Sequence, residues 1–315
     1  MKREYSHIGL AKLCGWFGIT RQAYYQSSWR AMDAGIESHL VLSAVRTIRI
    51  NHPRIGTRKL YEMIKPFMID HQIKMGRDAL FNLLSINNLL VRRRQRRIST
   101  TNSYHRFRKY PNLIRGYEAT RPEQLWVSDI TYWKIKKGHV YISLITDAYS
   151  HKIVGYQVAE SLATMESLKA LRMALKTKGK QSMNLIHHSD RGIQYCSKSY
   201  VKLLQDYEVR ISMTENGDPL ENAVAERING ILKHEYLENY EARNIKEAKA
   251  ILKANVELYN NERPHMSISN FTPNYVHSAQ GDIKLTKLWK NYYQKKPDIG
   301  NQCQDLETIV NVLQD

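Results

Sequence analysis

The chain has 315 residues, and its 48 Lys and Arg residues outnumber its 30 Asp and Glu residues, which gives a net charge of +18. A hydrophobic content of 42% is enough to build globular cores and excludes a mainly disordered chain. No stretch reaches the roughly 18 consecutive apolar residues of a membrane span. Residues 1–7 lack the apolar core of a signal peptide, so we expect a cytoplasmic protein without membrane contact.

The positive charge is concentrated in the first third of the chain. Residues 1–116 contain 22 Lys and Arg against 6 Asp and Glu, whereas residues 117–315 contain 26 against 24. Such an excess favours a polyanionic partner, because each basic residue placed on a phosphate releases condensed counterions. We therefore expect a nucleic-acid-binding front end joined to a nearly neutral module; a basic surface without a ligand is the alternative.

The first helical segment, residues 8–26, has the pattern of a helix-turn-helix. Its apolar residues have helical spacing, a glycine marks the turn, and Thr20 is expected to cap a second helix. Arg21 and Gln22 then lie on that second helix, where such side chains read base edges in the major groove. A plain helical hairpin with a solvated polar face explains this segment equally well.

Three more helical patterns between residues 39 and 91 predict a second all-α domain, which follows a linker expected at residues 32–37. The breaks between the helices are marked by Gly56 and Gly76, and Thr57 is expected as an N-cap. Residues 1–91, which contain both helical segments, have 13 Lys and Arg residues against 6 Asp and Glu residues, a net charge of +7. The two helical segments predict a DNA-binding arm in front of the rest of the chain.

A strongly basic segment follows this arm, with five arginines among residues 92–97. A basic run is often only a solvated linker, but its position beside two basic helical modules favours contact with phosphates. We therefore predict that Arg92, Arg93 and Arg94 contact the DNA backbone.

From residue 122 the pattern changes to strands that alternate with helices. Segments 125–133, 139–147 and 152–159 are expected to form an antiparallel meander. Further helices are expected at 165–178 and 197–206, and further strands at 184–190 and 209–213. Alternation of this kind adds parallel strands to the meander, so the fold class is α/β, with a mixed sheet and helices on its faces.

Three acids of this module are candidate metal ligands. Asp129 lies inside an apolar strand, Asp190 ends another, and Glu226 lies in an apolar run of a helix expected from residue 218 to about 237. A buried acid is costly without a partner or a metal, and carboxylates commonly hold paired Mg²⁺ ions in phosphodiester chemistry. Each acid alone more often has a structural role, so the prediction depends on their combination. Lys233, two helical turns after Glu226, is placed to present a cation to a phosphate.

Neighbouring polar residues are less suited to be metal ligands. Glu221 is expected to form a capping box with Asp218. Asn222 and Asn229 lie near the face of the helix that carries Glu226. A histidine that ends a strand, as His188 does, is more often a structural group than a metal ligand.

The segments around the three acids resemble the catalytic signature of bacterial insertion-sequence transposases with a retroviral-integrase-like core. They read Trp126-Val-Ser-Asp129-Ile-Thr131-Tyr132, His188-Ser-Asp190-Arg-Gly192 and Asn222-Ala-Val-Ala-Glu226. Thirty-five residues lie between Asp190 and Glu226, as in the Asp-Asp-Glu pattern of the family founded by insertion sequence three. Residues 259–265 and 272–273 resemble the closing motif of this family, and residues 52–60 resemble its helical DNA-binding segment.

The resemblance implies a ribonuclease-H-like core in which Asp129, Asp190 and Glu226 hold two Mg²⁺ ions, with Mn²⁺ able to substitute. It also implies that the protein nicks the 3′ ends of its element and then performs strand transfer into target DNA, acting as at least a dimer on paired ends. DNA contacts are expected from Arg21, Gln22, Arg58, Lys59, Arg92, Arg93, Arg94, Lys233 and Arg263.

The expected organisation has five parts. They are a helix-turn-helix module at 1–35, a second helical domain at 36–91, a basic linker at 92–121, the ribonuclease-H-like core at 122–278 and a helical tail at 279–315.

Two other functions explain part of the sequence. A non-enzymatic DNA-binding regulator accounts for the basic arm but not for the three acids. A plain ribonuclease-H-like nuclease accounts for the acids but has little need for two helical DNA-reading modules. A retroviral-type integrase requires a His-His-Cys-Cys zinc module, and residues 1–116 contain only one cysteine, Cys14.

Overall fold

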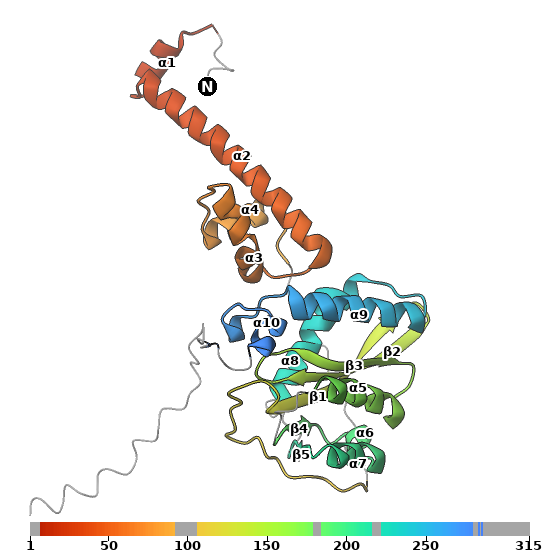
Figure 1. The fold of residues 1–315 in the computed structure, drawn as a ribbon. Coiled ribbons are helices and arrows are strands. Elements are labelled where there is room, and N and C mark those ends of the chain that lie inside the picture. The colour runs from red at the N-terminus through yellow and green to blue at the C-terminus, as the bar shows by residue number, and fades with distance from the viewer. Residues whose placement is uncertain are drawn as a thin grey trace, which may run out of the picture.

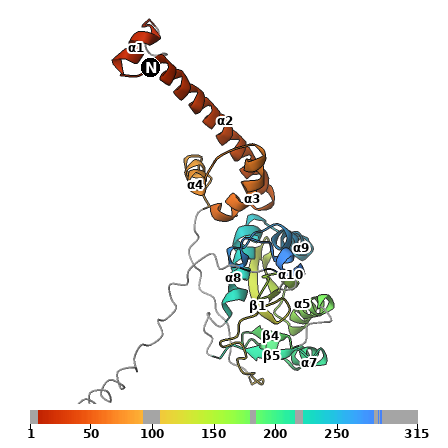
Figure 2. The same ribbon diagram turned by 60° about the vertical axis from the view of Figure 1, so that its left-hand side comes forward.

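A computed structural model describes residues 7–91, 106–178, 184–215 and 222–279, together with Ile283 and Leu285. The described residues form a helical module and an α/β core (Figures 1 and 2). The basic run of Arg92, Arg93 and Arg94, the capping box expected at 218–221 and nearly all of the tail after residue 279 lie outside these ranges.

The helical module is built on one long helix. Helix α1 (Leu10–Trp16) leads through a turn into α2 (Arg21–Asn51), which Thr20 caps by accepting a bond of 3.0 Å from the backbone N–H of Ala23. The linker expected at residues 32–37 is wrong, because α2 runs through it without a break. A single glycine there, Gly35, costs a helix only about 1 kcal/mol relative to alanine. The boundary expected at residue 35 therefore falls inside a helix.

Two shorter helices pack beside the C-terminal half of α2. They are α3 (Thr57–Asp70) and α4 (Arg77–Ile86), and Figure 1 shows them along the lower part of α2 while α1 lies at its far end. The shared core consists of Val41, Val45, Ile55, Leu60, Ile64, Met68, Ile73, Leu80 and Leu84. The helical patterns expected between residues 39 and 91 are confirmed, although Gly56 rather than Thr57 is the N-cap of α3.

The α/β core contains a five-stranded mixed sheet with the order β3-β2-β1-β4-β5. Strands β1 (Leu125–Ile135), β2 (Gly138–Asp147) and β3 (Ile153–Ala159) form the antiparallel meander, and β4 (Ile186–Ser189) and β5 (Arg210–Met213) add to it in parallel. This order and these directions confirm the expected α/β, ribonuclease-H-like fold. The short β4 pairs with β1 only over Leu125–Ser128 among the residues that the structure describes.

Helices cover both faces of the sheet. Helices α5 (Thr164–Thr177), α6 (Ile193–Cys196) and α7 (Lys198–Asp206) pack on one face around Trp126, and α8 (Ala223–Ile231) and α9 (Ile245–Asn261) pack on the other around Trp133. Helix α5 crosses β3 so closely that a Cβ atom at Gly155 would collide with the carbonyl oxygen of Ala170. The expected helices at 165–178 and 197–206 are thereby confirmed.

The chain after α8 keeps a helical course but changes its geometry. A π-helical segment, η2 (Leu232–Tyr236), continues α8 and passes into a 3₁₀ turn, η3 (Leu237–Asn239). A second 3₁₀ turn, η4 (Met266–Ile268), and α10 (Pro273–Ser278) close the described core. The helix expected to reach about residue 237 does so, but its last turns are not α-helical.

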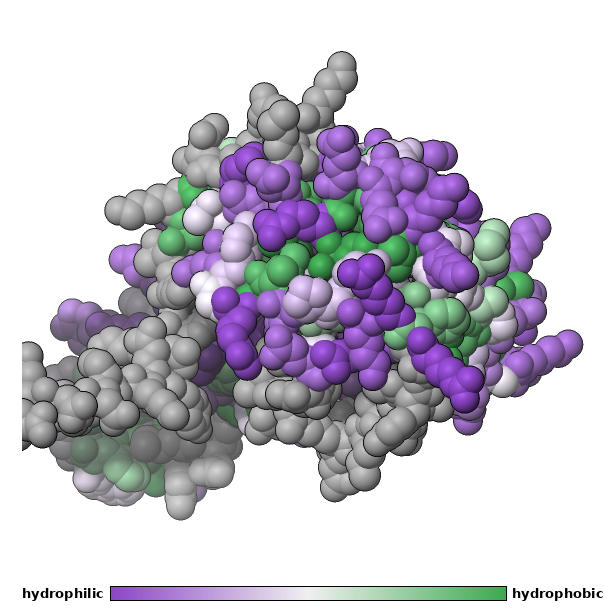
Figure 3. Space-filling view, turned by 90° about the horizontal axis from the view of Figure 1, so that it is seen from below, coloured by the Kyte–Doolittle hydropathy of each residue, from purple (hydrophilic) through white to green (hydrophobic). Residues whose placement is uncertain are grey.

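The surface of the core is mostly polar at the end away from the helical module. Figure 3 views this end and shows hydrophobic residues in the middle of a mainly hydrophilic surface. Among the helices within the described ranges, none has both the length and the apolar character that crossing a membrane requires.

Candidate active site

Two of the candidate acids lie at neighbouring positions of adjacent strands. In the parallel ladder of β1 and β4, Ser128 pairs with Ser189, so Asp129 and Asp190 are the next residues of the two strands. Adjacent strands lie about 4.8 Å apart. The pairing therefore places the two aspartates at neighbouring backbone positions, where β4 ends and β1 continues.

A glycine permits the conformation of Asp190. The backbone N–H of Gly192 donates a bond of 3.0 Å to Asp190 Oδ1, which holds the carboxylate against the turn that starts α6. A Cβ atom at position 192 would lie 3.0 Å from the same oxygen, closer than such atoms normally approach. A side chain at position 192 would therefore displace the carboxylate.

The third acid lies on a helix that is anchored to β1 at two points. Asn222 Nδ2 donates to the carbonyl oxygen of Ser128 at 3.0 Å, and Asn229 Nδ2 donates to Asp129 Oδ2 at 2.7 Å. The two asparagines are seven residues apart and so lie on one helical face. Glu226 lies between them in sequence, and the contacts of Asn222, the N-cap residue of α8, and of Asn229 with β1 agree with the expectation that the two asparagines lie on one side of α8.

The pKa of Asp129 is raised, and the other two acids contribute to the shift. Burial raises the pKa of Asp129 to about 7, and repulsion by Asp190 and, to a smaller extent, by Glu226 contributes. Bonds from Asn229 and from the backbone N–H of Ile130 act in the opposite direction and keep the carboxylate oriented. Asp190 and Glu226 are therefore close enough to Asp129 to interact with it electrostatically.

The chemistry of these three acids suits a hard divalent cation. Carboxylate oxygens are the ligands that Mg²⁺ prefers, and a cation would relieve the repulsion that raises the pKa of Asp129. In the part of the chain that the structure describes, however, no three His, Cys, Asp or Glu side chains are close enough together to hold a metal ion as they stand.

Replacing Asp129 with Asn is expected to stabilise the metal-free protein by about 2 kcal/mol at pH 8 and much less at pH 5. The folded state raises the pKa of Asp129 from 3.8 to about 7. Between these values the native protein holds a proton that the unfolded chain releases, so wild-type stability falls as the pH rises from about 4 to about 7. Urea unfolding in EDTA at both pH values measures the effect. A difference between variant and wild type that is equal at pH 5 and pH 8 would contradict it.

The predicted DNA contact of Arg263 is wrong. Its side chain is fully buried, with Nε 2.8 Å from Glu235 Oε2 and Nη2 2.7 Å from Glu235 Oε1. This two-point ion pair occupies the edge of the guanidinium that would bind a phosphate. Arg263 therefore holds the core together instead of facing DNA.

Lys233 lies over an aromatic ring near the acids. Its ammonium nitrogen is 3.7 Å from the ring centre of Tyr132, a residue of β1 that is 40% exposed and lies three positions after Asp129. Lys233 belongs to the π-helical segment η2 rather than to the α-helix expected there. The predicted phosphate contact of Lys233 stays a prediction.

The predicted contacts of the helical module have different surroundings. Arg21, Gln22 and Arg58 are exposed, so their DNA contacts stay predictions. Lys59 lies against the core, where burial and repulsion by Arg263 lower the pKa of its ammonium group. A lysine in that position is less suited to a phosphate than its neighbour Arg58.

Two polar groups beside the acids are structural. His188 is buried, and its Nδ1 is 2.8 Å from Ser212 Oγ, in agreement with the structural role expected for it. The hydroxyl of Ser189 donates to the carbonyl oxygen of Asp190 at 3.0 Å. This bond ties the end of β4 to the turn that carries the acid.

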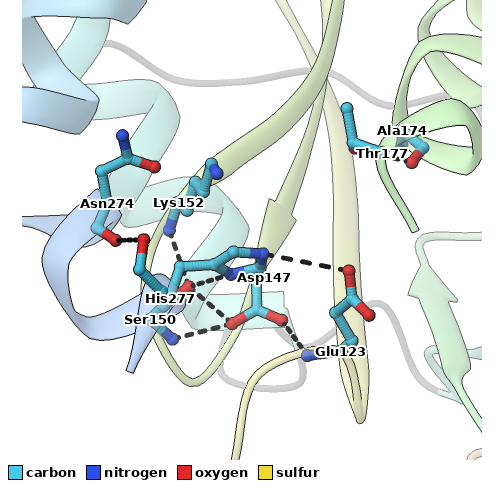
Figure 4. Close-up of polar contacts among 9 residues, drawn as sticks. Glu123, Asp147, Ser150, Lys152, Ala174, Thr177, Asn274 and His277 are labelled. Atoms are coloured by element: carbon cyan, nitrogen blue, oxygen red, sulfur yellow. Dashed lines mark hydrogen bonds and ion pairs between the residues drawn. The ribbon is translucent and has the colours of Figure 1, made fainter. Parts of the chain in front are cut away.

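A second buried acid, Asp147, belongs to a hydrogen-bond network that connects the sheet to α10 (Figure 4). It accepts bonds from the backbone N–H and the hydroxyl of Ser150 at 2.8 and 2.7 Å and from the backbone N–H of Glu123 at 2.7 Å. Burial raises the pKa of Asp147 to about 6. His277 Nδ1 is 3.0 Å from Ser150 Oγ, but the serine proton goes to Asp147, so this trio lacks the proton path of a serine nucleophile.

The sequence and the structure of the chain are similar to those of known proteins. Two family models, both described as integrase core domain, match residues 119–219 and 207–273. The chain is 32% identical to an uncharacterized 31 kDa protein of insertion element IS600 from Shigella sonnei, over 83% of this chain and 96% of that protein. It is 30% identical to the transposase of insertion sequence element IS629 from Shigella sonnei, over 81% and 86%. The catalytic core domain of HTLV-2 integrase, solved in complex with magnesium, matches 50% of this chain and 97% of its own, with 18% identity and a TM-score of 0.40.

Proposed function

Since the chain belongs to the insertion-sequence-three family of DNA transposases, we propose that Asp129, Asp190 and Glu226 are its catalytic residues. The observation that carries this proposal is the pairing of β1 with β4, which sets Asp129 beside Asp190 under the helix that bears Glu226. The raised pKa of Asp129 supports it, because both other acids contribute to the shift.

The three carboxylates would hold two Mg²⁺ ions, and Mn²⁺ would substitute. When bound, the ions supply activation of the attacking oxygen and stabilisation of the leaving oxygen. The residues of the chain supply the rest. Asn229 and the backbone N–H of Ile130 orient Asp129, and Gly192 orients Asp190. Because its raised pKa leaves Asp129 partly protonated near pH 7, loading the site releases a proton.

The reaction takes place in two steps at the same acids. Water first attacks a phosphodiester at the element end, and the 3′ oxygen leaves as a free hydroxyl. That 3′-hydroxyl then attacks a second phosphodiester, so one bond forms for each that breaks, and a circular intermediate is later inserted into target DNA. No covalent bond between protein and DNA is required.

The partners proposed for the chain are double-stranded DNA of the element ends and of the target. The basic residues of the first 116 positions supply the affinity, and joining two ends requires at least a dimer. We place this activity in the bacterial cytoplasm, where the element DNA is.

The direct test is to incubate the protein with a duplex that carries the terminal sequence of its own element, with and without Mg²⁺. Magnesium-dependent nicking at the 3′ end, followed by joining, supports the proposal. Binding without any cleavage in Mg²⁺ or Mn²⁺ would favour a DNA-binding regulator. Cleavage confined to RNA–DNA hybrids would favour a ribonuclease-H-like nuclease.

Two kinds of DNA contact, one in the helical arm and one in the basic segment that follows it, are expected to respond differently to substitution. Neutralising Arg92, Arg93 and Arg94 should weaken binding to all duplexes alike and lower the salt dependence by up to about three units of slope, because these residues are assigned to phosphates. Replacing Arg21 with Ala should change the sequence preference. Binding isotherms on element-end and unrelated duplexes at several salt concentrations measure both. An equal loss on all sequences for Arg21→Ala would argue against base reading there.

A further inference from the structure

A buried polar contact joins the helical module to the core. His52 follows the last residue of α2, belongs to the segment 52–60 and is 1% exposed. Its Nδ1 is 2.9 Å from the hydroxyl of Tyr236, and its Nε2 is 3.0 Å from Glu262 Oε2. Both partners belong to the core, so this histidine faces the core rather than DNA.

The chemistry of the partners determines the state of the ring. The carboxylate of Glu262 only accepts, so Nε2–H of His52 donates to it, and Nδ1 accepts from the hydroxyl of Tyr236. Burial lowers the pKa of His52, which keeps the ring neutral at neutral pH. Since both ring nitrogens are used, the orientation of the ring follows the positions of Tyr236 and Glu262.

The two core partners are adjacent in sequence to a second buried pair. Tyr236 is the last residue of η2, and the residue before it, Glu235, is paired with Arg263. Glu262 in turn precedes Arg263. The C-terminal end of η2 therefore has two contacts, one with Arg263 after α9 and one with His52 of the helical module.

Segment η2 connects this contact to the catalytic residues. It continues α8 directly, so it joins Tyr236 to the helix that bears Glu226. Isolated π-helical segments are rare and often lie at functional sites. The helix α8 that bears Glu226 is bonded to β1 beside Asp129, so the position of α8 determines how Glu226 is presented to the other two acids.

We propose that His52 is a positioning residue, through which the helical module that holds DNA sets the position of the Glu226 helix. The inference depends on the proposed function, because it assumes that the module binds element ends. DNA bound to the module restricts the movement of the turn after α2, which contains His52. Because His52 is bonded to Tyr236, the movement of η2, and of α8 before it, is restricted as well.

The first test removes one hydroxyl group. Tyr236→Phe keeps the ring and deletes only the bond to His52, whereas Tyr61→Phe deletes a tyrosine bond that stays inside the helical module, from Tyr61 to the carbonyl oxygen of Met75. Addition of end DNA should slow amide hydrogen exchange at residues 223–236 in the wild type and in Tyr61→Phe but not in Tyr236→Phe. The affinity for end DNA should be the same in all three.

The second test changes the other partner. Glu262→Leu should lower the cleavage rate at saturating Mg²⁺ and DNA about tenfold, as loss of an orienting contact commonly does. Glu262→Gln keeps an oxygen acceptor for Nε2–H and should restore the wild-type rate.

The outcomes separate the two proposals. The inference is overturned if end DNA does not slow exchange at residues 223–236 in the wild type, or if the slowing survives in Tyr236→Phe. A wild type that shows the slowing but never cuts DNA in Mg²⁺ overturns the proposed chemistry alone.

Discussion

Substitution of any one catalytic acid, as Asp129→Asn, Asp190→Asn or Glu226→Gln, is expected to lower strand cleavage by a factor of about 1000 or more while leaving binding to element ends largely intact. Under the proposed function each change removes one carboxylate ligand of the metal, whose stabilisation of transition-state charge would amount to several kcal/mol, and about 1.4 kcal/mol corresponds to a factor of ten in rate. Single-turnover cleavage of a labelled end duplex in Mg²⁺, beside an isotherm for binding in EDTA, measures both quantities.

A matched control is Asp206→Asn, which removes an exposed carboxylate at the end of α7. It should cleave as the wild type does. Substantial magnesium-dependent cleavage by any of the three active-site variants would remove that residue from the proposed site. Loss of end binding in step with loss of cleavage would show instead that the substitution had damaged the fold.

The second large effect is expected on stability. Arg263→Met should lower the free energy of unfolding by about 3 kcal/mol, because it leaves Glu235 as a partly buried charge without its ion-pair partner. The double variant Arg263→Met/Glu235→Met should recover much of the loss, since apolar residues can replace a buried ion pair. Urea unfolding at neutral pH measures all of these values.

Arg172→Ala provides the control for this comparison, because Arg172 is exposed on α5. Its free energy of unfolding should stay within about 0.5 kcal/mol of the wild-type value. If Arg263 were a DNA contact, Arg263→Met would leave stability unchanged and reduce the salt dependence of DNA binding. That result would contradict the structural role.

The sheet and the acids could be predicted because they depend on local pattern. The strand around Asp129 is an apolar run broken by one acid, and Asp190 directly follows a short apolar strand. Parallel pairing then brings strand ends together at one place, which is why a linear pattern predicted a site in space. Asn229 was placed correctly for a similar reason, since helical spacing determines which residues share a face.

Two features that differ from the predictions depend on partners far away in the sequence. Arg263 resembles a surface cation until its partner Glu235, 28 residues earlier in the chain, is known. The burial of His52 depends on Tyr236 and Glu262, which are 184 and 210 residues away. The continuity of α2 differs from the linker expected at residues 32–37, because one glycine, Gly35, costs a helix only about 1 kcal/mol.

Because α2 is one continuous helix, its two ends are kept at a constant distance from each other. Its 31 residues rise about 46 Å at 1.5 Å each, which is more than the roughly 35 Å of one turn of duplex DNA. Arg21 stands at one end of this rod, and the other end is bonded to the core through His52. An α-helix does not stretch as a flexible linker does. Under the proposed function, the length of α2 would therefore fix the distance between the bases contacted by Arg21 and the phosphodiester that is cut at the core.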